Sequence, residues 1–223
     1  MNSCLRDRGF SIFENVLSPQ DCDSLIAATG TASHGVAGIR NLMSNPAVSS
    51  LAYDSRMLSL ATQILGAKAI PFRATLFDKQ VGSNWHVLWH QDRALPMSNR
   101  IECDGWGPWS TKAGVAYALA PAWALEHVIA LRLHLDDAID RNGPLRVISG
   151  SHLAGVLLPT QISEMVDTGR AMACLVGKGG VLAMRPLLLH SSSKAKDNRR
   201  RRVLHIEYAD RLDFGDGLQL LVA

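Results

Sequence analysis

The segment NWHVLWHQD, residues 84–92, places two histidines and an aspartate close together in the chain. Side chains alternate between the two faces of a β-strand, so His90 and Asp92 would point the same way and Gln91 the opposite way. An imidazole and a carboxylate on one face are suitable ligands for a transition metal. His86 shares that face, but at ~3.3 Å per residue it lies ~13 Å before His90, too far to bind the same ion.

The H-x-D pattern alone is weak evidence for a metal site. Residues 134–136 and 205–207 form two further pairs of this kind, and a polar pair at a strand end is the ordinary interpretation. The pair His90 and Asp92 is favoured because His190 follows one hundred residues later, at the end of the apolar segment GVLAMRPLLLH. Together the three would supply two imidazoles and one carboxylate, the ligand set of non-haem iron sites.

Two polar residues follow the second histidine at distances that could serve such a site. Arg201 begins the segment RRVLHIEY, eleven residues after His190. A guanidinium near the metal suits a dicarboxylate cosubstrate, because it pairs with a carboxylate in bidentate fashion. Ser192 would share the face of His190 and could hydrogen bond the same carboxylate. The side chain of Arg202 should face the other way.

The first third of the chain predicts helices. Residues 18–21, Ser-Pro-Gln-Asp, are typical of a helix start with a cap, a proline at the first position and a carboxylate at the third, and Gly30 suits its end. Asn45-Pro46 repeats the start signal. Apolar residues then recur at helical spacing over 57–65, and Gly66 suits a C-terminal stop.

From about residue 70 onward, short apolar or alternating segments are separated by turn residues, which indicates about eight strands. Helices followed by strands favour helices packed on a closed or sandwiched antiparallel sheet, such as a cupin-type jelly roll. We therefore expect a mainly β fold with helices, in one domain over 1–223. Helices would support it in 1–68, a double-stranded β-helix core would span 69–211, and a short helix would be inserted near 159–169.

Four segments, WHQD, NGPLRVISGSH, GGVLAMRPLLLH and RRVLHIEY, occur in this order and resemble the phytanoyl-CoA dioxygenase family over most of residues 70–210. That family comprises non-haem oxygenases that depend on Fe(II) and 2-oxoglutarate. The resemblance implies that the metal ligands are His90, Asp92 and His190. It further implies that Arg201 binds the C5 carboxylate of 2-oxoglutarate, with Ser192 assisting and Trp109 as a weaker candidate for lining the cosubstrate.

The resemblance also implies a reaction. The expected enzyme is a dioxygenase that consumes 2-oxoglutarate and O₂, releases succinate and CO₂, and hydroxylates an unactivated C–H bond of a small molecule. Three protein ligands leave three positions on the iron for the cosubstrates. Related halogenases lack the carboxylate ligand, so the presence of Asp92 disfavours halogenation.

Candidates for the substrate pocket come from two segments. Trp106 lies in the glycine-rich loop DGWGPWSTKAG and Tyr117 follows it, and for Trp106 plain packing is an equally good interpretation. In ALRLHLDD, Arg132 and His134 alternate with leucines, so one face of this strand is polar. That face would either line the pocket or be solvated. Trp85 is expected to form part of the barrel wall.

The composition limits the remaining possibilities. Hydrophobic residues make up 47%, charged residues 19%, and the net charge is only +3, so no nucleic-acid partner is expected. No signal peptide or membrane-spanning segment is evident, and the four scattered cysteines are expected to be free thiols in a cytoplasmic monomer or small homo-oligomer.

Two alternatives fit the same sequence features. A non-redox cupin-like protein, either a metal-dependent isomerase or a ligand-binding protein, could keep the three metal ligands but would not need Arg201 and Ser192. A nucleic-acid or protein demethylase of the same fold is less favoured, because the charge is modest and no separate basic domain is evident.

Overall fold

The computed structural model describes residues 3–30, 38–80 and 83–222. The helices are α1 (Ser3–Arg8), α2 (Pro19–Thr29), α3 (Pro46–Ala52), α4 (Ser55–Leu65), α5 (Ala122–Leu125) and α6 (Pro159–Thr168). The strands are β1 (Phe10–Phe13), β2 (Gly38–Ile39), β3 (Ile70–Lys79), β4 (Val87–His90), β5 (Ala94–Met97), β6 (Trp109–Lys112), β7 (Val115–Leu119), β8 (Val128–His134), β9 (Leu145–Ile148), β10 (Ala171–Cys174), β11 (Val181–Met184), β12 (His190–Ser192) and β13 (Arg201–Ala209).

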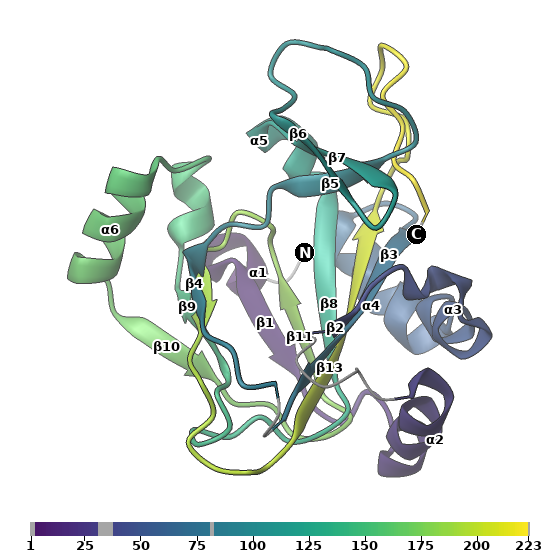
Figure 1. Ribbon diagram of the computed structural model, residues 1–223, viewed down its shortest axis with the longest axis vertical. Helices are drawn as coiled ribbons and strands as arrows, with labels where there is room; N and C mark the ends of the chain where they lie inside the picture. The colour runs from purple at the N-terminus through teal and green to yellow at the C-terminus, as the bar shows by residue number, and fades with distance from the viewer. Residues whose placement is uncertain (1–2, 31–37, 81–82, 223) are drawn as a thin grey trace.

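The strands form a jelly roll built from antiparallel sheets, which confirms the predicted fold class. A six-stranded sheet has the order β1-β11-β8-β13-β3-β2, and a four-stranded sheet has the order β10-β9-β12-β4. A three-stranded sheet, β5-β7-β6, lies at the upper end of the view in Figure 1. Helices α2, α3 and α4 lie on one side of the six-stranded sheet, and α6 lies on the opposite side of the molecule.

Four helix boundaries in the N-terminal region lie at the residues that the sequence indicated. Ser18 and Asp21 form a reciprocal capping box at the start of α2, and Gly30 ends it. The Asn45 side chain caps α3, and Gly66 ends α4 in the left-handed conformation that glycine adopts without strain. Helix α6 occupies the predicted insertion near 159–169.

The structure adds elements that the sequence patterns did not indicate. The segment that ends in α4 is two helices, because Asp54 caps α4 as a separate helix after α3. Strand β1 lies within the expected helical region and pairs with β11 at the edge of the six-stranded sheet. Strand β2 likewise pairs with β3. Strands of two and four residues are too short for their period to be recognised, so they depend on distant partners.

The two faces of the six-stranded sheet differ in chemistry. Alternate residues of β13, such as Leu204 and Ile206, pack with the helices in one apolar core. The residues between them face the interior of the barrel, where Arg201 is paired across the sheet with Lys79 and Glu207 with Arg73. The helices therefore bury an apolar face, while the barrel interior holds polar and charged side chains.

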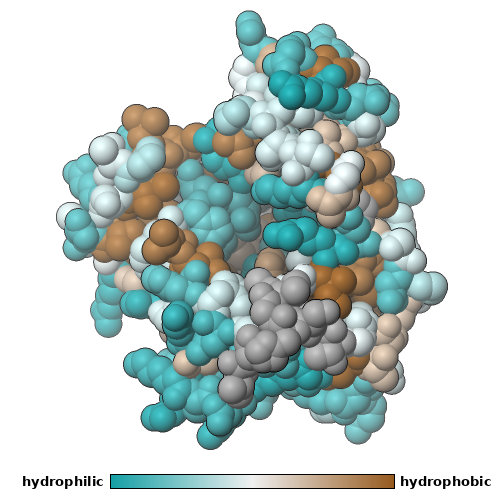
Figure 2. Space-filling view, in the orientation of Figure 1, coloured by the Kyte–Doolittle hydropathy of each residue, from teal (hydrophilic) through white to brown (hydrophobic). Residues whose placement is uncertain are grey.

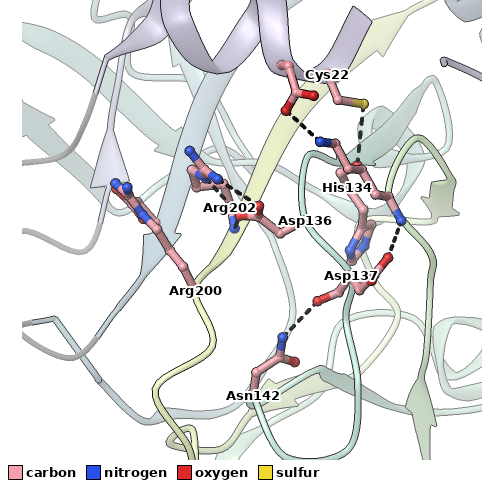
Figure 3. A network of polar contacts seen from close by, with 10 residues as sticks. Cys22, His134, Asp136, Asp137, Asn142, Arg200 and Arg202 are labelled. Atoms are coloured by element: carbon pink, nitrogen blue, oxygen red, sulfur yellow. Dashed lines mark hydrogen bonds and ion pairs between the residues drawn. The ribbon is translucent and has the colours of Figure 1, made fainter. Parts of the chain in front are cut away.

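A polar network fixes the turn that follows β8. Asp136 accepts hydrogen bonds from the Arg202 side chain at 2.7 Å and from its backbone N–H at 2.9 Å (Figure 3). The Asn142 amide donates to the carbonyl of Asp137 at 2.7 Å. Arg202 thus faces away from the barrel interior, as alternation predicted, and Asp136 has a partner outside any metal site.

Two further features concern the cysteines and the length of the helices. Cys22, Cys103 and Cys174 are free thiols. In the part of the chain that the structure describes, no helix is long and apolar enough to cross a membrane.

Candidate active site

Three side chains from two paired segments meet at one point of the barrel. His190, the first residue of β12, is the antiparallel partner of His90, the last residue of β4. Asp92 lies two residues beyond His90, and its carboxylate oxygens are 3.5 Å from Nε2 of His90 and 3.4 Å from Nε2 of His190. One donor atom from each residue lies within 4.8 Å of the others, a spacing that suits a single metal ion.

Hydrogen bonds to the backbone orient all three side chains. Nδ1 of His90 donates to the carbonyl of Leu88 at 2.8 Å, and Nδ1 of His190 donates to the carbonyl of Leu188 at 2.8 Å. A carbonyl can only accept, so each Nδ1 carries a proton, and Nε2 is the ring nitrogen that lies toward Asp92 and would bind a metal. The Asp92 amide donates to the carbonyl of Pro186 at 2.9 Å, which fixes the third ligand.

The surroundings of the site shift the pKa values of Asp92 and His190 toward their deprotonated forms. Burial by itself would raise the pKa of Asp92, but the nearby His190, His90 and His205 outweigh it and hold that pKa well below its usual value. Burial lowers the pKa of His190 to about 4. At neutral pH Asp92 is therefore a carboxylate and His190 a neutral imidazole, the forms that coordinate metal.

Gln91 points away from the ligands and holds the surrounding loops. Its amide nitrogen donates to the carbonyls of Gly155 and Leu187, each at 2.8 Å, and its oxygen accepts from the backbone N–H of Leu157 at 2.9 Å. The residue between the two ligands is therefore fully hydrogen bonded and anchors the strand end that carries them.

A small cavity of about 110 Å³ adjoins the ligands on the interior side of the barrel. Arg201 and Ser192 line it together with the three ligands. The Arg201 side chain donates to Ser192 Oγ and to the carbonyl of Asn142, both at 3.3 Å. The Ser192 hydroxyl donates to the carbonyl of Gly143 at 3.0 Å, so its oxygen is left to accept from cationic neighbours.

Lys79 is a further cation of this cluster that the sequence analysis did not single out. It is only 1% exposed, its Nζ donates to Ser192 Oγ at 3.0 Å, and the ammonium lies 5.2 Å from the centre of the Trp85 ring. It is also the cross-strand partner of Arg201. Burial, with a smaller contribution from Arg201, lowers the pKa of Lys79 to about 7.

The charge balance of the small cavity fits an anionic cosubstrate. Arg201 and Arg132 both line it and are 4% and 7% exposed, and neither has a carboxylate partner among the described residues. Buried cations facing one another are unfavourable unless an anion joins them. The donor set of two imidazoles and one carboxylate suits Fe(II), and the cations beside it suit the far carboxylate of 2-oxoglutarate.

A larger cavity of about 430 Å³ also adjoins two of the ligands. His90, Asp92 and Phe77 line both cavities. The remaining lining residues are Arg40, Arg73, Thr75, Gln91, Arg93, Ala94, Lys112, Tyr117, Leu119 and His205. Figure 2 shows a hollow between the α6 side and the β5–β7 side of the molecule, with hydrophilic residues around it.

The structure brings some of the candidate substrate residues to these cavities. Tyr117 lines the larger one. Arg132 lines the smaller one, where it donates to Nδ1 of His205 at 2.9 Å and lies 5.3 Å from the centre of the Phe77 ring. Trp85, expected as barrel wall, also lines the smaller cavity.

Other candidates lie elsewhere. Trp106 packs edge-on against Phe214, with ring centres 5.6 Å apart, and lines neither cavity. Trp109 lines neither cavity and packs against the same apolar cluster. His134 is 1% exposed, and neither ring nitrogen has a hydrogen-bond partner among the described residues. Its interior-facing strand position is as expected, but it lies outside both cavity linings.

Several lining residues escaped the sequence analysis although a signal for them exists. In RATLFDK, Arg73, Thr75, Phe77 and Lys79 occupy every second position, so one face of β3 carries them all. Their opposite face supplies Ala74 and Leu76 to the apolar core. His205 was considered only as a rival metal ligand, yet it lines the larger cavity beside that face.

Comparisons with known proteins give a consistent result. The model of the phytanoyl-CoA dioxygenase (PhyH) family matches residues 5–203. An L-proline trans-4-hydroxylase from Streptomyces griseoviridis is 27% identical over 178 residues, which cover 68% of this chain and 59% of that protein. This chain therefore spans about three fifths of the length of that curated relative.

Solved structures of other proteins share the fold. EctD from S. alaskensis with 2-oxoglutarate and 5-hydroxyectoine superimposes with a TM-score of 0.70 at 18% identity, covering 95% of this chain and 76% of EctD. The non-heme alpha-ketoglutarate-dependent carbocyclase SnoK from nogalamycin biosynthesis gives a TM-score of 0.71 at 15% identity, covering 98% of this chain and 94% of SnoK. Since the family model spans most of the chain and the ligand set fits, the protein belongs to the phytanoyl-CoA dioxygenase family.

Proposed function

We propose that the protein is an Fe(II)- and 2-oxoglutarate-dependent dioxygenase that hydroxylates an unactivated C–H bond of a small molecule, with release of succinate and CO₂. The observation that carries this proposal is the position of the ligands. His90 and Asp92 lie at the boundary between a small cavity rich in buried cations and a larger cavity. A metal there would have the cosubstrate on one side and the substrate on the other.

The side chains around the proposed metal have separable tasks. His90, Asp92 and His190 would hold Fe(II), which supplies oxidative chemistry when 2-oxoglutarate and O₂ are bound. Arg201 would pair with the C5 carboxylate and so fix the cosubstrate in one orientation. Ser192 accepts a hydrogen bond from Arg201 and donates one to the carbonyl of Gly143, and thereby holds the guanidinium in place.

The alternative functions account less well for the interior of the barrel. A non-redox isomerase or ligand-binding protein would need the metal ligands but not the buried cations beside them. The fold itself does not separate hydroxylation from other oxidations, because SnoK is described as a carbocyclase and shares it. Hydroxylation is proposed because an L-proline trans-4-hydroxylase is 27% identical to this chain over 178 residues.

The proposal is tested by measuring succinate formed from 2-oxoglutarate under air. We expect slow, Fe(II)-dependent succinate formation that stops when a chelator removes the metal, and that falls at least about tenfold in Asp92→Ala. His86→Ala is the matched control, since His86 is exposed and lies outside the ligand cluster. Absence of succinate from well-folded, iron-loaded protein would count against the proposal, as would full activity in Asp92→Ala.

A further inference from the structure

We propose that the substrate carries an anionic group, a carboxylate or a phosphate, which Arg93 binds together with Arg40 and Lys112. This inference rests on the proposed function and names its substrate class. The anionic end would lie against these three cations in the larger cavity, while the carbon to be oxidised lies beside His90 and Asp92.

Arg93 is the residue with the clearest unused binding capacity. It directly follows Asp92, and its carbonyl accepts a hydrogen bond from the Ala120 amide at 2.9 Å, so its backbone is fixed between the metal site and the end of β7. Its Nε is buried and has no hydrogen-bond partner among the described residues. A buried guanidinium N–H without an acceptor is unfavourable, and an anion in the cavity would supply one.

Two more cations reach the same cavity from separate elements. Arg40 follows β2, and Lys112 ends β6, where its ammonium lies 5.3 Å from the centre of the Tyr117 ring. Among the described residues, neither has an ion pair with a carboxylate. Three cations without acidic partners therefore converge on one cavity from β2, β6 and the segment after β4.

The other charged residues of the larger cavity do not neutralise Arg93, Arg40 and Lys112. Asp92 is the one carboxylate among the lining residues, and it is committed to the proposed metal. Arg73 also lines the cavity, but it pairs with Glu207 and donates to the carbonyl of Ala94 at 3.0 Å. The positive charge of Arg73 is thus already balanced, whereas that of Arg93, Arg40 and Lys112 is left for a ligand.

Ion pairs balance several solvent-exposed arginines elsewhere in the protein. Arg56 pairs with Asp21 and Asp54, Arg100 pairs with Glu102, and Arg211 pairs with Asp210. Arg146 and Arg170 are exposed without such a pair among the described residues, so the lack of an ion pair does not by itself mark a binding site. The distinguishing observation is the buried Nε of Arg93, which has no acceptor among the described residues.

The cavity also limits the rest of the substrate. Its volume of about 430 Å³ lies within the range of small-molecule sites. Phe77, Tyr117 and Leu119 give it an apolar or aromatic wall beside the cations. The expected substrate is therefore a small molecule with an anionic end and a hydrocarbon part, and the hydrocarbon part is what faces the metal ligands.

The test uses matched pairs of probes, one anionic and one neutral. Calorimetry on anaerobic protein with Fe(II) and 2-oxoglutarate would measure binding of hexanoate against hexanamide, N-acetyl-L-proline against N-acetyl-L-prolinamide, and glycerol 3-phosphate against glycerol. We expect the anionic member of at least one pair to bind at least tenfold more tightly than its neutral counterpart. Whether a carboxylate or the phosphate shows this preference identifies the anion.

Variants connect the preference to the named residues. Arg93→Gln is expected to weaken binding of the preferred anion at least tenfold, and Lys112→Gln, at an exposed position, to weaken it about threefold. Arg199→Gln is the control, because Arg199 is exposed and lines neither cavity. Equal binding of neutral and anionic probes, binding of none of the anions, or an unchanged affinity in Arg93→Gln would overturn the proposal.

The same samples separate this inference from the proposed function. Succinate formation by the unsubstituted protein without any probe reports on the proposed function alone. A protein that forms succinate but shows no preference for anions would contradict only the substrate class, and one that binds anions without ever forming succinate would contradict only the oxygenase activity.

Discussion

At the scale of single residues, the protonation states around the site are set by burial. His190 is neutral because burial lowers its pKa to about 4, and it is held by the carbonyl of Leu188 so that Nε2 faces Asp92. The cations Arg201 and Lys79 are buried across from one another, and burial lowers the pKa of Arg201 to about 9 and that of Lys79 to about 7. Because a pKa of about 7 is close to physiological pH, the charge of Lys79 changes in that pH range.

Affinity for 2-oxoglutarate should therefore depend on pH through Lys79. Protonated Lys79 favours a nearby carboxylate, so affinity is highest below the pKa of about 7 and falls as the pH rises through it. Between about pH 6 and about pH 8 we expect up to about a tenfold loss, measured by anaerobic titration. Lys79→Met should remove this slope, whereas the exposed Lys68→Met should keep it. The same slope in Lys79→Met would show that another group titrates.

At the scale of elements, the turn Asn142-Gly143-Pro144 does more than reverse the chain. The carbonyl of Asn142 accepts from Arg201, and that of Gly143 accepts from Ser192. Gly143 has a φ of +68°, and a Cβ there would lie 2.4 Å from the carbonyl oxygen of Ser193 and 3.1 Å from Nζ of Lys79. The turn is therefore in close contact with the cation cluster.

Gly143→Ala is expected to destabilise the protein and to weaken 2-oxoglutarate binding. Gly114→Ala is the matched control, because Gly114 has a φ of +78° but nothing lies within 4 Å of its Cβ position. Both variants incur the strain of a positive φ, on the order of 1 kcal/mol. Since only Gly143→Ala also forces backbone apart, its free energy of unfolding in urea should fall by at least about 1 kcal/mol more. Equal losses of unfolding free energy in the two variants would mean that the turn can move to make room for the added Cβ.

Elements also show what sequence patterns can and cannot predict here. The alternation expected for residues 90–92 matches the structure in that Gln91 points away from Asp92, although β4 ends at His90 and both residues lie just beyond it. The pairing of His190 with His90 depends on the register between β12 and β4, which no local pattern specifies. That His190 would join His90 was expected from the order of the motifs, which resembles that of the phytanoyl-CoA dioxygenase family. Lys79 was not predicted because its segment was taken only as one of several apolar or alternating segments, and its polar face was not considered by itself.

At the scale of the whole molecule, the N-terminal helices support the six-stranded sheet from the side away from the site. Tyr208 of β13 is completely buried and its hydroxyl donates to the carbonyl of Ala52 at the end of α3, at 3.0 Å. Strand β13 therefore joins two layers: Arg201 and His205 face the barrel interior, and Tyr208 holds the helical layer.

Tyr208→Phe is expected to lower the free energy of unfolding by about 1 kcal/mol, because it leaves a buried carbonyl without its donor. The control is Tyr53→Phe, since Tyr53 is 54% exposed and should lose almost nothing. Chemical denaturation of both variants measures this difference in unfolding free energy. Identical unfolding curves for the two variants would contradict a structural role for this contact.

The central claim is that one metal ion joins a cosubstrate cavity to a substrate cavity. Anaerobic addition of Fe(II) and then 2-oxoglutarate tests it most directly, by the weak visible charge-transfer band that chelation of the keto acid to iron produces. The band should form in the unsubstituted protein and in His86→Ala, be absent in Asp92→Ala, and need more 2-oxoglutarate in Arg201→Ala. A folded protein that forms no band, or an Asp92→Ala variant that forms it undiminished, would contradict the assignment of this site.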